Sequence, residues 1–184
     1  DFITFNYTRT FDYLLGCYRD KVNLDSGVPI HIHGMLGQDV VLGIDNEMQI
    51  QNVSFNVSKK LKRAFIKPFF NELFDSNRVK SAINRIKNSD IICVYGMSLG
   101  ESDLMWTRLL IDWLKSSKSN MLFYFQFGKE KYNVWDRDLM MDVEDEKKEK
   151  LLRRISDSEE EMEAIFEQVH IPIAYDIFDF TLVI

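Results

Sequence analysis

Short apolar runs alternate along the chain with longer stretches in which apolar residues recur every three or four positions. Short runs that end in Gly, Asn or Ser are typical of buried strands, and the longer spacing is typical of helices that bury one face. The pattern therefore predicts strands over residues 1–5, 28–32, 40–43, 91–95 and 121–127, with one or two more within 171–184.

Helices are expected between these strands, beginning near residues 10, 58, 76, 98 and 158. Ser98 with Glu101 and Ser158 with Glu161 match the capping box that starts many helices, and Ser102 is a second possible cap for the helix after residue 98. Pro68 should kink or split the second of these helices. A charged excursion at about 129–157 is expected to be a solvated helix or a mobile connection.

Strands that alternate with helices indicate an α/β protein with a mostly parallel sheet and helices on its faces. A chain of 184 residues is long enough for one full core, so we expect a single domain over 1–184. The chain starts within an expected strand and without Met, which suggests the C-terminal part of a longer protein.

The composition indicates a globular protein of the cytoplasm. The hydrophobic fraction is 46%, and no apolar run approaches the roughly 20 residues that span a bilayer, so no membrane partner is expected. The net charge of -6 argues against nucleic acid as a partner. Cys17 and Cys93 form no disulfide framework, which fits a reducing cytosol, and Cys93 should be buried in its strand.

Polar motifs follow three of the expected strands, where the carboxyl ends of parallel strands form ligand-binding crevices. Asn6, after the first strand, can hold a ribose hydroxyl, a carboxamide or a water, or it can simply cap the next helix. His33, before Gly34, can take a proton from a hydroxyl, or it can be a hydrogen-bonded structural histidine. His31 should share a strand face with His33, and no metal site is expected from their spacing.

The third motif opens a helix. Ser98 can contact a ligand and Asp103 can accept hydrogen bonds from ribose hydroxyls, although both residues can equally serve only as helix caps. The chain contains neither a Walker-type loop nor a glycine-rich dinucleotide fingerprint.

Together, FNYT at 5–8, HIHG at 31–34 and YGMSLGESD at 95–103 resemble the AbiH family of phage abortive-infection proteins. That family in turn resembles the sirtuin-like NAD-binding domains of bacterial defence proteins. The sirtuin-like motifs are an Asn-Tyr-Asp type sequence, a His-Gly pair and a Gly-x-Ser-Leu sequence followed by Asp. They fall here on Asn6, on His33 with Gly34, and on Gly96, Ser98 and Asp103.

The resemblance implies a Rossmann-like three-layer domain, with helices on both sheet faces, that lacks the family's N-terminal Gly-rich segment. It also implies an NAD-type nucleotide as ligand or substrate. His33 would be the general base on a ribose hydroxyl, and Asn6 would position the nicotinamide ribose or a water. The residues expected to contact the nucleotide are Asn6, Thr8, Gly34, Gly96, Ser98 and Asp103. Hydrolysis of NAD to nicotinamide and ADP-ribose would halt growth and block the phage.

Two other functions stay open. Thr8 stands where the enzymatic motif has Asp, and Met97 where many AbiH-like sequences have His. These departures fit a non-catalytic module that senses a nucleotide or a phage trigger protein, and exposed aromatic surface would favour homo-oligomers. A nuclease or nucleic-acid binder is the third possibility, although the carboxylate cluster and basic groove it needs are not evident.

Overall fold

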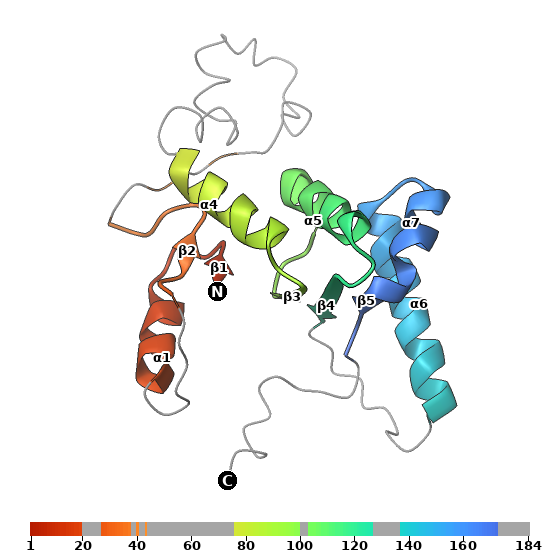
Figure 1. Cartoon of the computed structure of the whole chain (residues 1–184). Helices are drawn as coiled ribbons and strands as arrows, with labels where there is room; N and C mark the ends of the chain where they lie inside the picture. The colour runs from red at the N-terminus through yellow and green to blue at the C-terminus, as the bar shows by residue number, and fades with distance from the viewer. Residues whose placement is uncertain are drawn as a thin grey trace, which may run out of the picture. The chain divides into compact units, whose positions relative to one another are not determined.

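The computed structural model describes residues 1–19, 27–37, 40, 43, 76–99, 103–126 and 137–172. The chain divides into two compact units, Asp1–Asn88 and Ser89–Ile184 (Figure 1). The expected helix over 58–75 lies outside the described residues, as do most of the strands expected at 40–43 and 171–184. The single domain over 1–184 stays a prediction.

The first unit is built on a pair of parallel strands. Strand β1 (Ile3–Thr4) leads into helix α1 (Thr10–Arg19), and strand β2 (Ile30–His31) returns beside β1. The rings of Phe2 and Phe11 meet edge to face at 5.1 Å, which fixes the inner side of α1 against the chain before β1.

Helix α4 (Ser76–Lys87) packs against β2 and buries Ala82 and Ile86, as its apolar spacing predicts. The sequence spacing places Phe11, Leu14 and Leu15 on one face of α1, but Leu14 is 48% exposed. The short strands leave only a narrow face for α1 to cover, and Phe11 and Leu15 occupy its more sheltered side.

The second unit contains a three-stranded parallel sheet in the order β3-β4-β5. Its elements in chain order are β3 (Ile91–Tyr95), α5 (Leu104–Ser116), β4 (Met121–Phe125), α6 (Arg137–Ile155), α7 (Glu159–Ile165), a 3-10 turn (Phe166–Gln168) and β5 (Val169–His170). The expected α/β class with parallel strands is thus confirmed, whereas the three-layer arrangement stays a prediction.

The strands of this sheet have one buried and one open face. Val94, Leu122 and Tyr124 are buried, whereas Cys93 is exposed. The expectation of a buried Cys93 is wrong, because successive side chains of a strand point to opposite faces and Cys93 lies opposite Val94. The charged excursion contains α6, whose C-terminal end is not solvated but buries Leu151 and Leu152.

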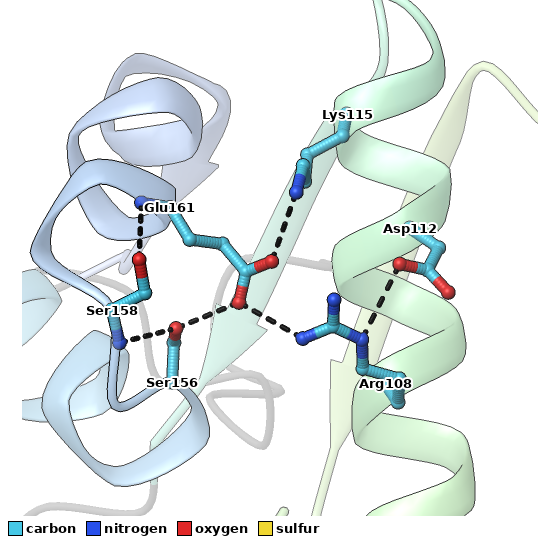
Figure 2. Close-up of polar contacts among 6 residues, drawn as sticks. All are labelled: Arg108, Asp112, Lys115, Ser156, Ser158 and Glu161. Atoms are coloured by element: carbon cyan, nitrogen blue, oxygen red, sulfur yellow. Dashed lines mark hydrogen bonds and ion pairs between the residues drawn. The ribbon is translucent and has the colours of Figure 1, made fainter.

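A buried carboxylate joins α7 to α5 (Figure 2). Glu161, 8% exposed, lies 3.0 Å from both Arg108 and Lys115 and accepts a hydrogen bond from Ser156 at 2.7 Å. The hydrogen bonds from Ser156 and Lys115 are the largest causes that lower the pKa of Glu161. Ser158 caps α7 through the Glu161 backbone N–H as expected, but the Glu161 side chain turns to α5 instead of completing the capping box.

A buried amide closes the C-terminal end of α5. The Nε2 group of Gln168 donates its two N–H groups among the carbonyl oxygens of Leu114, Ser117 and Asn120, at 2.8 to 2.9 Å. These carbonyls lie at or just beyond the helix end, where backbone acceptors have no intrahelical partner. Among the described residues, no helix is both long and apolar enough to cross a membrane.

Candidate functional site

The structure brings the first two sequence motifs side by side in the first unit. Beyond the short ladder of β1 and β2, Ile32 N–H donates to the Thr4 carbonyl at 3.0 Å, and Leu36 N–H donates to the Tyr7 carbonyl at 2.8 Å. The segment that carries Asn6 therefore runs along the segment that carries His33. Their proximity, expected from the carboxyl ends of parallel strands, follows from this backbone pairing.

His33 is packed between two aromatic rings of the first motif. The ring of Tyr7 is stacked on it at 5.7 Å, and the ring of Phe5 meets it edge to face at 5.6 Å. His33 is only 7% exposed. Partial burial of Tyr7 raises the pKa of its hydroxyl further above physiological pH, where a tyrosine hydroxyl is already neutral.

A tight turn follows His31. Gly34 N–H donates to the His31 carbonyl at 3.1 Å, and Gly34 has a φ of 76°, a conformation that glycine adopts without strain. Because β2 ends at His31, the strand alternation expected to place His31 and His33 on one face does not extend to His33.

Asn6 is exposed, but its backbone is anchored on both sides. Its N–H donates to Thr4 Oγ1 at 3.2 Å, and its carbonyl lies 3.1 Å from Nδ1 of His31. Asn6 does not occupy the N-cap of α1, because Arg9 accepts the first helical hydrogen bond, from Tyr13. Its side chain is therefore not committed to the helix start.

Thr8 lies on the exposed loop between Asn6 and α1, where its hydroxyl accepts a hydrogen bond from Thr10 at 3.3 Å. Asp12 lies on the first turn of α1, directly after this loop. Its Oδ2 lies 2.7 Å from Nε2 of His31, the shortest polar contact that the structure gives for either residue.

Asp12 was not among the residues predicted for the site. A signal was nevertheless present, since an acidic residue early in a helix that connects two parallel strands can reach the second strand. Among the described residues, no group of three or more His, Cys, Asp or Glu side chains is gathered as a metal site.

The third motif lies in the second unit, on the loop between β3 and α5. Two of its residues have left-handed backbone conformations, Gly96 with a φ of 66° and Leu99 with a φ of 50°. Leu99 is 1% exposed, so a buried side chain holds the loop in a conformation that costs a non-glycine residue energy. Ser98 between them is exposed.

A buried tyrosine supports this loop from the sheet. The Tyr124 hydroxyl donates to the Met97 carbonyl at 2.7 Å and accepts a hydrogen bond from Arg154 of α6 at 3.2 Å. Through Tyr124 the loop is thus connected to α6. None of the three sequence motifs lies in α6.

Helix α5 begins later than the capping box predicts. Its first residue is Leu104, and Asp103 occupies the N-cap position without a side-chain capping hydrogen bond. The capping role expected for Ser98 is wrong, because the left-handed turn at Leu99 prevents a helix from starting there. Asp103 is half-buried and Gly96 is exposed, and with Ser98 they stay predicted ligand-binding residues of the second unit.

Comparison with known proteins bears on all three motifs. No match was found among curated proteins or among solved structures. A family model described as bacteriophage abortive infection AbiH matches residues 1–125, which include the three motifs and extend from β1 to the end of β4. Because the match covers well over half of the chain, this protein belongs to the AbiH family of bacteriophage abortive infection proteins.

Proposed function

We propose that this protein, which acts in abortive-infection defence against phage, binds an NAD-type nucleotide at the ends of β1 and β2 and hydrolyses its nicotinamide–ribose bond. The observation that carries the proposal is the backbone pairing that sets Asn6 and His33 on neighbouring segments. It supports an amide and an imidazole acting on one ligand.

In this reaction, water attacks the ribose carbon C1′ as the bond from C1′ to the nicotinamide nitrogen breaks. The bonding electrons leave with nicotinamide, which becomes neutral, and the products are nicotinamide, ADP-ribose and a proton. The transition state has oxocarbenium character, as in other glycoside hydrolyses. His33 would accept a proton from a ribose hydroxyl, and Asn6 would hold the ribose or the attacking water.

The residues present fit such a ligand in one direction of approach. Asn6 and Thr8 are exposed, whereas Gly34 and His33 are buried, so a ligand would approach from the side of Asn6 and Thr8. Tyr7 keeps a neutral hydroxyl and covers one ring face of His33, so the imidazole has a fixed plane. Orientation of this kind is what a general base requires.

The burial of His33 favours a second function, a non-catalytic module that senses a nucleotide or a phage trigger protein. A ring 7% exposed and covered by Phe5 and Tyr7 is what a structural histidine would show. In that case the exposed loop with Asn6 and Thr8 would bind the nucleotide or the phage trigger protein without catalysing a reaction. Homo-oligomers of the chain would then transmit the binding event. Neither function assigns the chain a membrane or nucleic-acid partner.

Nicotinamide release from NAD by the full-length protein, with and without phage lysate, tests the proposal. We expect release by wild type and a loss of at least about 100-fold in His33→Gln and Asn6→Ala, within the range of removing a general base. Asn88→Ala, which changes an Asn at the end of α4 far along the chain, is the matched control and should keep full activity.

Calorimetry with NAD separates the two functions. Binding without release, by protein whose circular dichroism shows it to be folded, would favour the sensing module over the hydrolase. Absence of both binding and release under every condition would overturn the nucleotide proposal.

A further inference from the structure

One imidazole bridges the two ends of the loop that carries the first motif. Nδ1 of His31 lies 3.1 Å from the carbonyl oxygen of Asn6, where the chain leaves β1, and Nε2 lies 2.7 Å from Oδ2 of Asp12, on the first turn of α1. The loop of Asn6, Tyr7 and Thr8 lies between these two contacts. We call the His31 bridge to Asn6 and Asp12 the loop clamp.

The loop clamp is buried and made of strong partners. His31 is 6% exposed and Asp12 27%, so solvent competes weakly for the contact between them. A hydrogen bond between an imidazole and a carboxylate at this distance is charge-assisted and stronger than one between neutral groups. The contact therefore links the first turn of α1 to the end of β2.

The clamp replaces hydrogen bonds that the sheet does not provide. Strand β1 ends at Thr4, so the peptide groups of Asn6 have no place in the ladder with β2. The Thr4 hydroxyl accepts a hydrogen bond from the Asn6 N–H, and the Asn6 carbonyl faces Nδ1 of His31. Because this carbonyl and the Asp12 carboxylate both accept, the two His31 contacts are hydrogen bonds together when both ring nitrogens carry a hydrogen. These contacts restrict the backbone of Asn6, and with it the direction in which the Asn6 side chain leaves the chain.

We propose that His31 and Asp12 are positioning residues that fix Asn6 for the nucleotide, acting through the loop clamp without touching the ligand. This rests on the proposed function, and it gives the first histidine of the HIHG motif a role distinct from that of His33. Asp12 orients the His31 ring, and the ring then holds the Asn6 carbonyl. A small displacement of a positioned group is enough to cost about 100-fold in rate.

Steady-state nicotinamide release by the full chain tests this role. In Asp12→Ala and His31→Gln we expect kcat to fall about 10- to 100-fold with little change in KM, because binding survives while orientation is lost. Asp12→Asn keeps an acceptor oxygen for Nε2 and should recover most of that loss. Tyr13→Phe, at a neighbouring exposed position of α1, is the control and should match wild type.

A merely structural role would give a different pattern. If kcat in these variants follows the melting temperature alone, or if Asp12→Asn is as impaired as Asp12→Ala, the positioning role is overturned. Unchanged kcat in Asp12→Ala and His31→Gln would overturn it as well.

Nuclear magnetic resonance spectra of the amide groups test the loop clamp without relying on catalytic activity. In proton–nitrogen correlation spectra, Asp12→Ala should shift or broaden the backbone and side-chain amide signals of Asn6, and Tyr13→Phe should not. If wild type releases no nicotinamide, the proposed function falls while these signals still decide whether the clamp orders Asn6. Unaltered Asn6 signals in Asp12→Ala would overturn the clamp itself.

Discussion

The rings of Tyr7 and His33 are stacked, with their centroids 5.7 Å apart and an interplanar angle of 25°. Replacing Tyr7 by Ala uncovers one face of His33 and should cost about 1–3 kcal/mol in the free energy of unfolding, since a large ring and its stacking partner are lost. Tyr7→Phe keeps the ring and should lose less. Urea unfolding followed by circular dichroism measures both.

Tyr13→Ala is the control for this pair, because Tyr13 is 72% exposed and should change stability by no more than about 0.5 kcal/mol. Equal losses in Tyr7→Ala and Tyr13→Ala would contradict a packing role for the stacked ring.

The Glu161 carboxylate predicts a pH-dependent stability. Because the folded-state pKa of Glu161 lies below its ordinary value of 4.5, its contribution is complete above that value and is lost as the pH falls through the lower folded-state value. Glu161→Gln should therefore cost about 1–3 kcal/mol at neutral pH and progressively less in acid. Thermal unfolding at a series of pH values measures this difference.

Glu160→Gln offers the matched control, since Glu160 is an exposed neighbour in α7. A wild-type advantage over Glu161→Gln that stays constant down to strongly acidic pH would contradict the contribution of the ionised carboxylate.

The support of the third motif by Tyr124 predicts local loosening when its hydroxyl is removed. Tyr124→Phe leaves the Met97 carbonyl without its 2.7 Å donor and should cost about 1–2 kcal/mol. Hydrogen exchange at residues 96–99 should become faster in this variant and stay unchanged in Tyr13→Phe. Unaltered exchange at those residues would show that the buried Leu99 holds the loop by itself.

Removing the Gln168 amide at the end of α5 should lower the free energy of unfolding more than Tyr124→Phe does. Gln168→Leu removes the donor from the buried carbonyls of Leu114 and Asn120 and should cost about 2–4 kcal/mol, since these acceptors lose their partner, whereas the Ser117 carbonyl keeps the Asn120 N–H. Gln126→Leu, at an exposed position, is the control. Denaturant unfolding that gives equal midpoints for the two variants would rule out the helix-closing role.

The two exposed cysteines, Cys17 on α1 and Cys93 on β3, predict two reactive thiols in the native protein. Cys93 and Cys17 are both exposed, so both should react with a thiol reagent in the native protein, and Cys17→Ser should leave one reactive thiol per chain. Reaction of Cys93 only after addition of denaturant would show that another surface covers this face of β3.

Apolar periodicity was enough to predict the elements whose packing is local. Residues 91–95 form β3 as expected, and the spacing of Trp106, Leu110 and Trp113 gives the buried side of α5. Strong alternation or strong helical spacing leaves only one way to bury these side chains, so little tertiary information was needed.

The prediction failed where tertiary contacts decide the outcome. The left-handed conformation of Leu99 delays the start of α5, and no local pattern distinguishes a serine that caps a helix from one that precedes such a turn. Glu161 reads as the second half of a capping box, but cations on α5 draw its carboxylate away.

In the candidate site, too, some relationships could be predicted from the sequence and others depend on tertiary contacts. Motif order was enough to propose that Asn6 and His33 act together, and backbone pairing of their segments is found. The place of Asp12 in the first turn of a helix between two parallel strands allowed a contact with the second strand, but the pairing with His31 itself could not be predicted, because it depends on how α1 lies against β2.

The contacts at the end of α5 have a consequence for the part of this chain that matches the family model. The residues matched by the AbiH model stop at the end of β4, whereas Gln168, Glu161 and Arg154 all come from the chain beyond it. A protein cut at residue 125 would lose the third strand, the cover of α5 and the outer anchor of Tyr124. The stretch that matches the family model therefore depends on side chains beyond it to complete its packing, and residues 1–125 alone should be less stable than the whole chain.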